Sequence, residues 1–160
     1  MSTIKGWTVL VHPLFLHQLK LLIAAVGAEK AKKPDDYLRG ANAKLLAAII
    51  KFIDDVIPSD PAADIFRQGK TLGPDYRHWR RAKFGGGRFR LFFRYSSDPK
   101  VIVYAWVNDA QSLRTYGSKN DAYHVFRGML DRGNPPNDWS ALVAACAWPG
   151  SFGQILGHMF

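Results

Sequence analysis

The stretch between residues 79 and 116 constrains the fold of this chain more than any other part of the sequence. Residues 79–84 lead into three consecutive glycines at 85–87, a second run follows at 88–95, and a third at 101–107. Glycine adopts the backbone angles of a tight turn without steric cost. The pattern predicts an antiparallel sheet of three strands. The run 101–107 is apolar at both parities, so we expect it to be central in that sheet.

Cationic side chains fall on one face of this predicted sheet. Because side chains alternate along a strand, Arg81 and Lys83 share a face with Trp79. The side chains that share a face on the next strand are Arg88, Arg90, Phe92 and Arg94. An open face of this kind binds phosphates, and its rings Trp79 and Phe92 are placed to stack bases. A solvated outer face of an edge hairpin has the same composition, and the pattern alone leaves both interpretations open.

Composition places the chain among globular proteins with a polyanionic or acidic partner. Its 160 residues suit one domain, and its formal net charge is +9 with a pI near 9.9. Such a charge fits a nucleic acid or an acidic protein. Cys146 is the single cysteine, which excludes an internal disulfide and predicts a cytoplasmic protein. No segment has the length of a membrane span or the pattern of a secretion signal.

The remaining elements are predicted from apolar periodicity and from proline and glycine. We expect a strand at 7–11, then helices over 13–26, 34–58, 60–68 and 121–132, and a last helix capped by Asp138. This order predicts an α+β sandwich in which helices cover one face of an antiparallel sheet. The other face then stays available for a ligand.

Cleavage of RNA without a metal requires a base, a group that stabilises charge on phosphorus, and an acid. Clustered Arg and Lys supply the second requirement by electrostatic preorganisation. Tyr116, just beyond the last predicted strand, is a candidate acid or base, and a packed ring is the alternative. His78 and His124 show no pairing signal. No His or Cys spacing is typical of a metal site, so we expect no metal and no cofactor.

Several segments together carry a resemblance to a known family. The chain resembles the YhaV family of bacterial toxins, a branch of the RelE-like messenger-RNA interferases. The resemblance covers residues 6 to about 139 and implies a RelE-like fold with a toxin domain at 1–139. Residues 140–160 then form a C-terminal extension, a helix followed by a tail. The segments that carry it are 44–46, 66–70, 79–95, 106–109, 113–117, 121–123 and 135–139.

The resemblance implies an activity and a set of partners. It implies the toxin of a type II toxin–antitoxin pair, an endoribonuclease that cleaves messenger RNA, in connection with translation, by metal-independent attack of the 2′-hydroxyl. The implied antitoxin resembles PrlF, a swapped-hairpin DNA-binding protein. Operator DNA is then bound only through the antitoxin complex, and no membrane is involved.

The resemblance also assigns residues. RelE-like enzymes have two basic residues on the strand before the glycine turn and one after it. They often have an arginine shortly after the last strand, where this chain has Asn108, Asp109 and Ala110, and Arg114 is expected to supply that charge. The implied catalytic residues are Arg81, Lys83, Arg90, Arg114 and Tyr116, and the expected RNA-binding residues are Trp79, Arg88, Phe92, Arg94 and Lys119. We expect Arg81 to be an exposed strand cation whose loss leaves the fold intact.

Two other functions fit the same basic face. One is a non-catalytic RNA- or DNA-binding module, or a co-repressor subunit, that has no need of Tyr116. The other is a protein-interaction subunit whose basic groove holds an acidic antitoxin segment.

Overall fold

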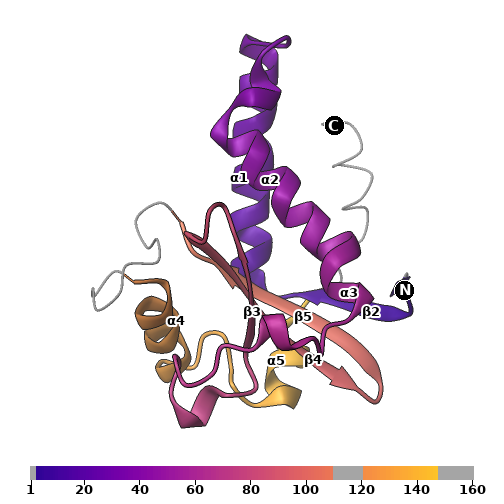
Figure 1. The fold of residues 1–160 in the computed structure, drawn as a ribbon, viewed down its shortest axis with the longest axis vertical. Coiled ribbons are helices and arrows are strands. Elements are labelled where there is room, and N and C mark those ends of the chain that lie inside the picture. The colour runs from indigo at the N-terminus through magenta and orange to yellow at the C-terminus, as the bar shows by residue number, and fades with distance from the viewer. Residues whose placement is uncertain (1–2, 110–120, 148–160) are drawn as a thin grey trace.

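Helices lie on both sides of one sheet in the computed structural model, which describes residues 3–109 and 121–147 (Figure 1). Two of the helices, α1 and α2, form an arm that projects from one side of the sheet. Helices α4 and α5 lie on the other side of the sheet. The strands are β1 Thr3–Ile4, β2 Trp7–Val11, β3 Arg80–Phe84, β4 Phe89–Ser97 and β5 Lys100–Val107. The α-helices are α1 Pro13–Lys32, α2 Ala41–Lys51, α3 Ile57–Ser59, α4 Ala122–Asp131 and α5 Trp139–Ala145.

The sheet is mixed, with the strand order β1-β2-β5-β4-β3. The antiparallel hairpins β3–β4 and β4–β5 confirm the three predicted strands, and β5 is central as expected. β2 pairs with β5 in parallel, so the prediction of a wholly antiparallel sheet is wrong. Parallel neighbours need a long crossover connection, which here includes α1, α2 and the two hairpin strands.

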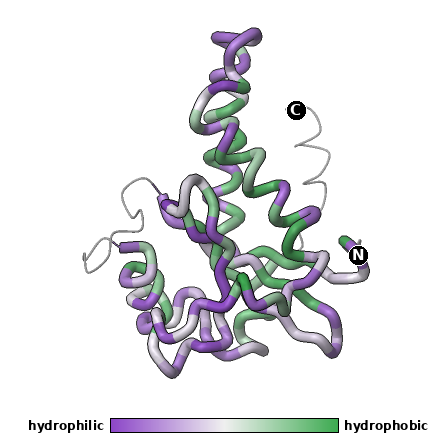
Figure 2. The backbone as a smooth tube through the Cα atoms, viewed as in Figure 1, coloured by the Kyte–Doolittle hydropathy of each residue, from purple (hydrophilic) through white to green (hydrophobic). Residues whose placement is uncertain are grey.

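The helical arm differs from its predicted boundaries. His12 caps α1, since its Nδ1 accepts a hydrogen bond from the Leu14 amide at 3.1 Å, and α1 continues through the expected connection as far as Lys32. A 3-10 turn at Tyr37–Arg39 precedes α2, so no helix opens at Pro34. Buried apolar residues of the two helices share one core with residues of the sheet. Hydrophobic and hydrophilic residues alternate along both helices (Figure 2). Within the described ranges, no helix has the length and apolar character needed to cross a bilayer.

The region between the arm and the sheet is less helical than predicted. The path of α2 continues through a π-helical turn, Phe52–Val56, into α3, and ends at Ser59, one residue beyond Pro58. The expected helix at 60–68 is only a 3-10 turn, Asp64–Phe66, and a second such turn spans Pro74–Tyr76.

Helices α4 and α5 cover the second face of the sheet, so the expectation that one face stays available is wrong. Phe126 of α4 and Leu142 of α5 belong to a buried cluster with Phe92, Val103 and Trp106. The predicted cap Asp138 is confirmed, since it accepts a hydrogen bond from the first turn of α5. Asp121 accepts one from the first turn of α4, so it is the cap of that helix and not its first residue as expected. The other face carries a separate apolar core against α1 and α2. Both faces of the sheet are therefore covered by helices, and a cationic side chain on a strand is either buried beneath a helix or exposed at the edge of the sheet.

A bulge in β5 directs side chains toward α4. Phe92 pairs with Trp106, but the next residue, Phe93, pairs with Tyr104, which leaves Ala105 as the extra residue. Bulges interrupt strict alternation and redirect side chains. Trp106 is thereby placed beside Phe92, with its ring stacked at a centroid distance of 5.9 Å.

Candidate active site

Two arginines share one tyrosine hydroxyl at the edge of the second face. The Nε atoms of Arg81 on β3 and Arg90 on β4 donate to the Tyr123 hydroxyl oxygen at 2.8 and 3.2 Å. Tyr123 lies in the first turn of α4, and the Arg90 guanidinium lies 5.7 Å from the centre of its ring. The residues Arg81, Arg90 and Tyr123 are only 8%, 4% and 5% exposed. We call these three residues the arginine–tyrosine cluster.

Strand pairing explains why these cations meet. Arg81 pairs with Phe92 and Lys83 with Arg90, which places three cations at neighbouring positions on the α4 side. Lys83 is exposed, so it provides the solvent-facing charge beside the buried pair. The predicted association of Arg81, Lys83 and Arg90 on one face is confirmed.

Backbone carbonyls fix the two buried guanidinium groups. Arg81 donates to the Ile65 carbonyl at 2.8 Å, and Arg90 donates to the carbonyls of Phe89, at 3.1 Å, and Gly87. Glycines 85–87 all have positive φ, between 62° and 83°, which favours glycine. The predicted turn thus also supplies an acceptor for the site. The expectation that Arg81 is an exposed cation is wrong, because its side chain is buried and bonded on two sides.

Asn108 continues the sheet where β5 ends. Its Oδ1 accepts from the Arg90 amide at 2.6 Å, and its Nδ2 donates to the Arg88 carbonyl at 3.0 Å. Asn108 therefore holds the backbone that carries Arg90. In the sequence, Asn108 stood out only because it lies where an arginine is expected shortly after the last strand.

Tyr123 was not predicted as a site residue. Its side chain reaches Arg81 across 42 positions of sequence, and no local spacing links the two. The available signals were the predicted helix over 121–132 and the resemblance segment 121–123, which together place Tyr123 at a helix start. Of the other predicted residues, Arg88 is exposed on the hairpin. Arg114, Tyr116 and Lys119 lie outside the described residues.

Trp79 and Phe92 belong to the core, so the expectation that they lie on an open face is wrong. Both side chains are 0% exposed. Phe92 stacks on Phe126 at 4.3 Å, and Trp79 meets Phe126 edge-on at 5.1 Å. The indole Nε1 also donates to the Asn137 side chain at 3.1 Å. Base stacking on either ring requires displacement of α4.

Arg94 is also buried, at the far end of β4. Its guanidinium lies 5.6 Å from the Trp79 ring and 5.3 Å from the Trp139 ring, and it donates to the Asn137 carbonyl. Burial lowers the pKa of Arg94, and the nearby Asp138 carboxylate acts in the opposite direction. The partners of Arg94 are Asn137 and the two tryptophans, none of which belongs to the arginine–tyrosine cluster.

We expect Phe92→Ala to lower the free energy of unfolding by about 3–5 kcal/mol, because it removes a buried ring and leaves a cavity. Phe92→Leu is the matched control and should lose much less. Chemical denaturation measures both. If Phe92→Ala keeps its stability but loses RNA affinity, the ring is a binding residue and not a core residue.

Other reactive groups in the described part of the chain do not form a second centre. Among residues 3–109 and 121–147, no three His, Cys, Asp or Glu side chains group as a metal site would require. His78 and His124 are both exposed. Burial raises the pKa of the Cys146 thiol to about 12, so this cysteine is protonated at neutral pH.

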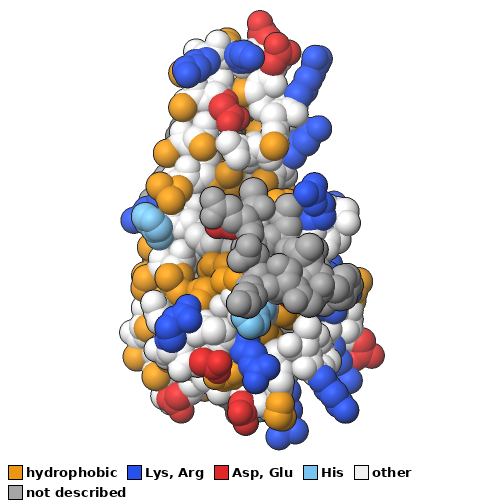
Figure 3. Space-filling view, turned by 90° about the vertical axis from the view of Figure 1, so that its left-hand side faces the viewer, with side chains coloured by type: hydrophobic (Ala, Val, Ile, Leu, Met, Phe, Trp, Pro, Cys, Tyr) orange, Lys and Arg blue, Asp and Glu red, His pale blue; other side chains and the backbone are white. Residues whose placement is uncertain are grey.

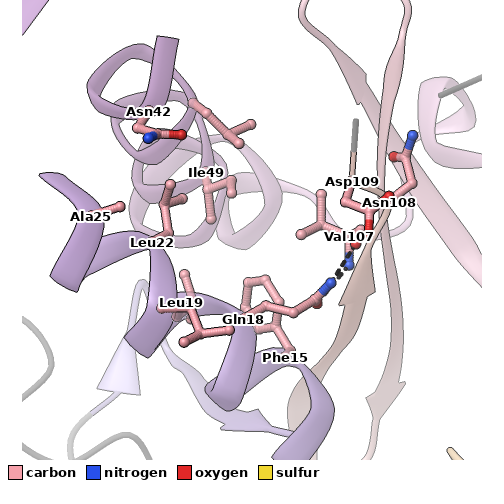
Figure 4. Close-up of a pocket in the computed structure, with 12 residues that line it drawn as sticks. Phe15, Gln18, Leu19, Leu22, Ala25, Asn42, Ile49, Val107, Asn108 and Asp109 are labelled. Atoms are coloured by element: carbon pink, nitrogen blue, oxygen red, sulfur yellow. Dashed lines mark hydrogen bonds between the residues drawn. The ribbon is translucent and has the colours of Figure 1, made fainter. Parts of the chain in front are cut away.

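An apolar cavity of about 320 Å³ lies on the opposite side of the sheet, between α1, α2 and the end of β5 (Figure 4). Leu19, Leu22 and Ile49 line it, and Gln18 bonds both backbone groups of Val107, at 2.6 and 3.1 Å. Its described lining is mainly apolar and includes no Lys or Arg, whereas the arginine–tyrosine cluster is cationic. Lys and Arg side chains are also spread over the arm and the body, as expected from the net charge (Figure 3).

Known proteins match this chain over most of its length. A family model described as a toxin with endonuclease activity, of a toxin–antitoxin system, matches residues 9–147. The chain is 49% identical over 141 residues to "Ribonuclease toxin YhaV" of Escherichia coli K12, covering 88% of this chain and 92% of the relative. "Toxin YhaV" of Escherichia coli O6:H1 matches with the same identity and coverage. No solved structure matches the chain.

Proposed function

Because this chain belongs to the YhaV family, toxins with endonuclease activity from toxin–antitoxin systems, we propose that it cleaves RNA at the arginine–tyrosine cluster. The observation that carries the proposal is the pair of guanidinium groups held on one buried hydroxyl beside the exposed Lys83. Fixed guanidinium groups recognise phosphate, and their charge cannot be lost at neutral pH.

The proposed reaction is an internal transfer at phosphorus. The 2′-oxygen attacks the adjacent phosphorus and forms a new O–P bond, while the bond to the 5′-oxygen breaks. A base takes the 2′-proton and an acid gives a proton to the 5′-oxygen, which leaves a 2′,3′-cyclic phosphate and a 5′-hydroxyl. Arg81, Arg90 and Lys83 stabilise the negative charge that builds on the phosphoryl oxygens, by about 2.7–4 kcal/mol per well-placed donor.

We expect cleavage to continue in the presence of a chelator and to stop when the cleaved position carries a 2′-deoxynucleotide. The cations supply the charge stabilisation, and the substrate supplies the nucleophile. The assay compares free RNA with RNA on ribosomes, since translating ribosomes are the proposed setting. Loss of activity with chelator and its return with added magnesium would contradict the metal-independent mechanism. Binding without cleavage in both settings would favour a non-catalytic RNA-binding module.

Tyr116 and Arg114 remain proposals drawn from the family resemblance. If the Tyr116 hydroxyl transfers a proton, Tyr116→Phe should lower the single-turnover rate by about 10²–10⁴-fold. If the ring only stacks on a base, Tyr116→Phe should be nearly wild-type, while Tyr116→Ala loses about 1–3 kcal/mol of RNA binding. Equal rates for both variants and the parent would remove Tyr116 from the site.

An antitoxin partner follows from the family. We propose that this partner is a PrlF-like swapped-hairpin protein, that it carries the contacts to operator DNA, and that the toxin domain at 1–139 has a RelE-like fold. Two N-terminal helices, followed by consecutive antiparallel hairpins, support that fold. Expression of the chain without the partner should arrest growth, and co-expression with the product of a neighbouring swapped-hairpin gene should restore it.

A further inference from the structure

A cationic cavity lies toward the opposite end of β4 from the arginine–tyrosine cluster. β3 pairs with β4 only as far as Arg80 and Phe93, so residues 94–97 extend beyond the end of β3. The cavity lies at this step and has a volume of about 230 Å³. Its lining residues are Arg77, His78, Arg80, Arg94, Tyr95 and Ser97.

Aromatic rings hold two of its arginines in place. The Arg80 guanidinium lies 5.1 Å from the centre of the Tyr95 ring and donates to the Ala63 carbonyl at 3.0 Å. Arg94 lies near two tryptophan rings and donates to a backbone carbonyl. A guanidinium has five N–H donors, so each group retains donors that these bonds do not use. Stacked arginines are already ordered and lose little entropy when they bind a planar or tetrahedral anion.

The charge of the lining is of one sign. Three guanidinium groups and the imidazole of His78 are combined with the hydroxyl groups of Tyr95 and Ser97, and none of the described lining residues is acidic. The nearby Asp138 opposes part of the Arg94 charge. A concave site lined by cations concentrates the local field and attracts phosphate.

We infer that this cavity binds a phosphodiester of the RNA chain at a distance from the cleaved bond. The inference rests on the proposed ribonuclease function and adds a second contact to it. Arg90 and Arg94 are four residues apart on one strand, which corresponds to roughly 13 Å. An RNA chain that reaches both sites must extend beyond the nucleotides at the cleaved bond. The cavity therefore contributes to affinity for longer RNA without taking part in the chemistry.

The test measures binding of a non-cleavable RNA of roughly 12 nucleotides, 2′-O-methylated throughout, over a range of salt concentrations. Arg77→Gln is the main variant, because Arg77 is exposed and should not affect folding. Arg80→Gln is the second, with thermal unfolding as a check on its lost bond to Ala63. Arg39→Gln, an exposed arginine on the arm, is the matched control. A 2′-O-methyl dinucleotide serves as the short ligand.

We expect Arg77→Gln and Arg80→Gln each to weaken binding of the long RNA about tenfold. Each should reduce the slope of log affinity against log salt by about 0.7, the value for one phosphate contact to a single strand. Dinucleotide binding should be unchanged in both variants, and Arg39→Gln should behave as the parent. Because the probe cannot be cleaved, a failure of the parent to cleave RNA would count against the proposed function and leave this comparison intact.

Three results would overturn the inference. One is an unchanged affinity and salt slope in Arg77→Gln. Another is an equal loss for an oligoglutamate peptide, which would make the cavity a site for acidic protein. The third is saturable calorimetric binding of inorganic phosphate to the parent that Arg77→Gln loses while long RNA binds as before, which would make it a site for free phosphate.

Discussion

Arg90→Ala is expected to lower the single-turnover rate of RNA cleavage by about 10²–10³-fold. The reason is that Arg90 is a fixed donor, and removal of one preorganised donor to a developing anion has an effect of this size. Arg90 is held by the Tyr123 hydroxyl and by backbone carbonyls of the glycine turn, so its guanidinium needs little reorganisation. Rapid-quench kinetics with enzyme in excess measures the rate directly.

A loss of folding stability in Arg90→Ala has to be distinguished from a direct loss of cleavage rate. Arg90→Ala removes hydrogen bonds of a buried charged group, and we expect the free energy of unfolding to fall by about 1–3 kcal/mol. Arg90→Lys keeps the positive charge but loses the planar set of donors, so its rate should lie between the alanine variant and the parent. Arg39→Ala, on the arm, is the control for loss of an exposed arginine. A folded Arg90→Ala protein that cleaves at the parent rate would remove Arg90 from the reaction.

Tyr123→Phe is the second variant with a large expected effect. It keeps the ring, which meets Phe92 edge-on at 5.6 Å, and removes only the hydroxyl that accepts from both guanidinium groups. We expect kcat to fall about 10²-fold, the effect of a misplacement of about 1 Å at a reacting centre, with little change in KM. The free energy of unfolding should fall by about 1.5–3 kcal/mol, the value of a hydrogen bond to a charged group.

A positioning role and a merely structural role of Tyr123 give different results. Tyr104→Phe is the matched control, because Tyr104 is a buried tyrosine on the other core, with its hydroxyl 3.5 Å from the Ile53 carbonyl. It should lose stability and keep its rate. If Tyr123 only positions the arginines, its phenylalanine variant should keep the shape of the pH–rate profile. A changed profile would instead identify the Tyr123 hydroxyl as an acid or base.

Local patterns in the sequence were sufficient to predict the part of the site that lies on one hairpin. The glycine turn sets the register, and alternation then places Lys83 opposite Arg90 and Arg81 two residues away on the same face. These relations span a few residues. They do not determine whether the face is open, which depends on where α4 packs.

The features that the sequence did not predict depend on long-range packing. Tyr123 reaches the arginines only because α4 covers the second face, and the parallel pairing of β2 with β5 joins residues about ninety positions apart. For the same reason Arg81 was expected to be exposed, and Phe92 was expected to be open to a base. The predicted start of the second helix is wrong for a local reason: Pro34 is a residue type typical of a helix start, but here a 3-10 turn separates α1 from α2.

The coupling between Arg90 and Tyr123 in the cleavage rate is the most direct test of the arginine–tyrosine cluster as the catalytic centre. The measurement is a double-mutant cycle of single-turnover rates for the parent, Arg90→Ala, Tyr123→Phe and the double variant, all in the presence of chelator. If the hydroxyl acts by holding the guanidinium groups, the double variant should lose much less than the product of the two single losses. Two single losses that multiply fully, or single variants that both cleave at the parent rate, would contradict the assignment.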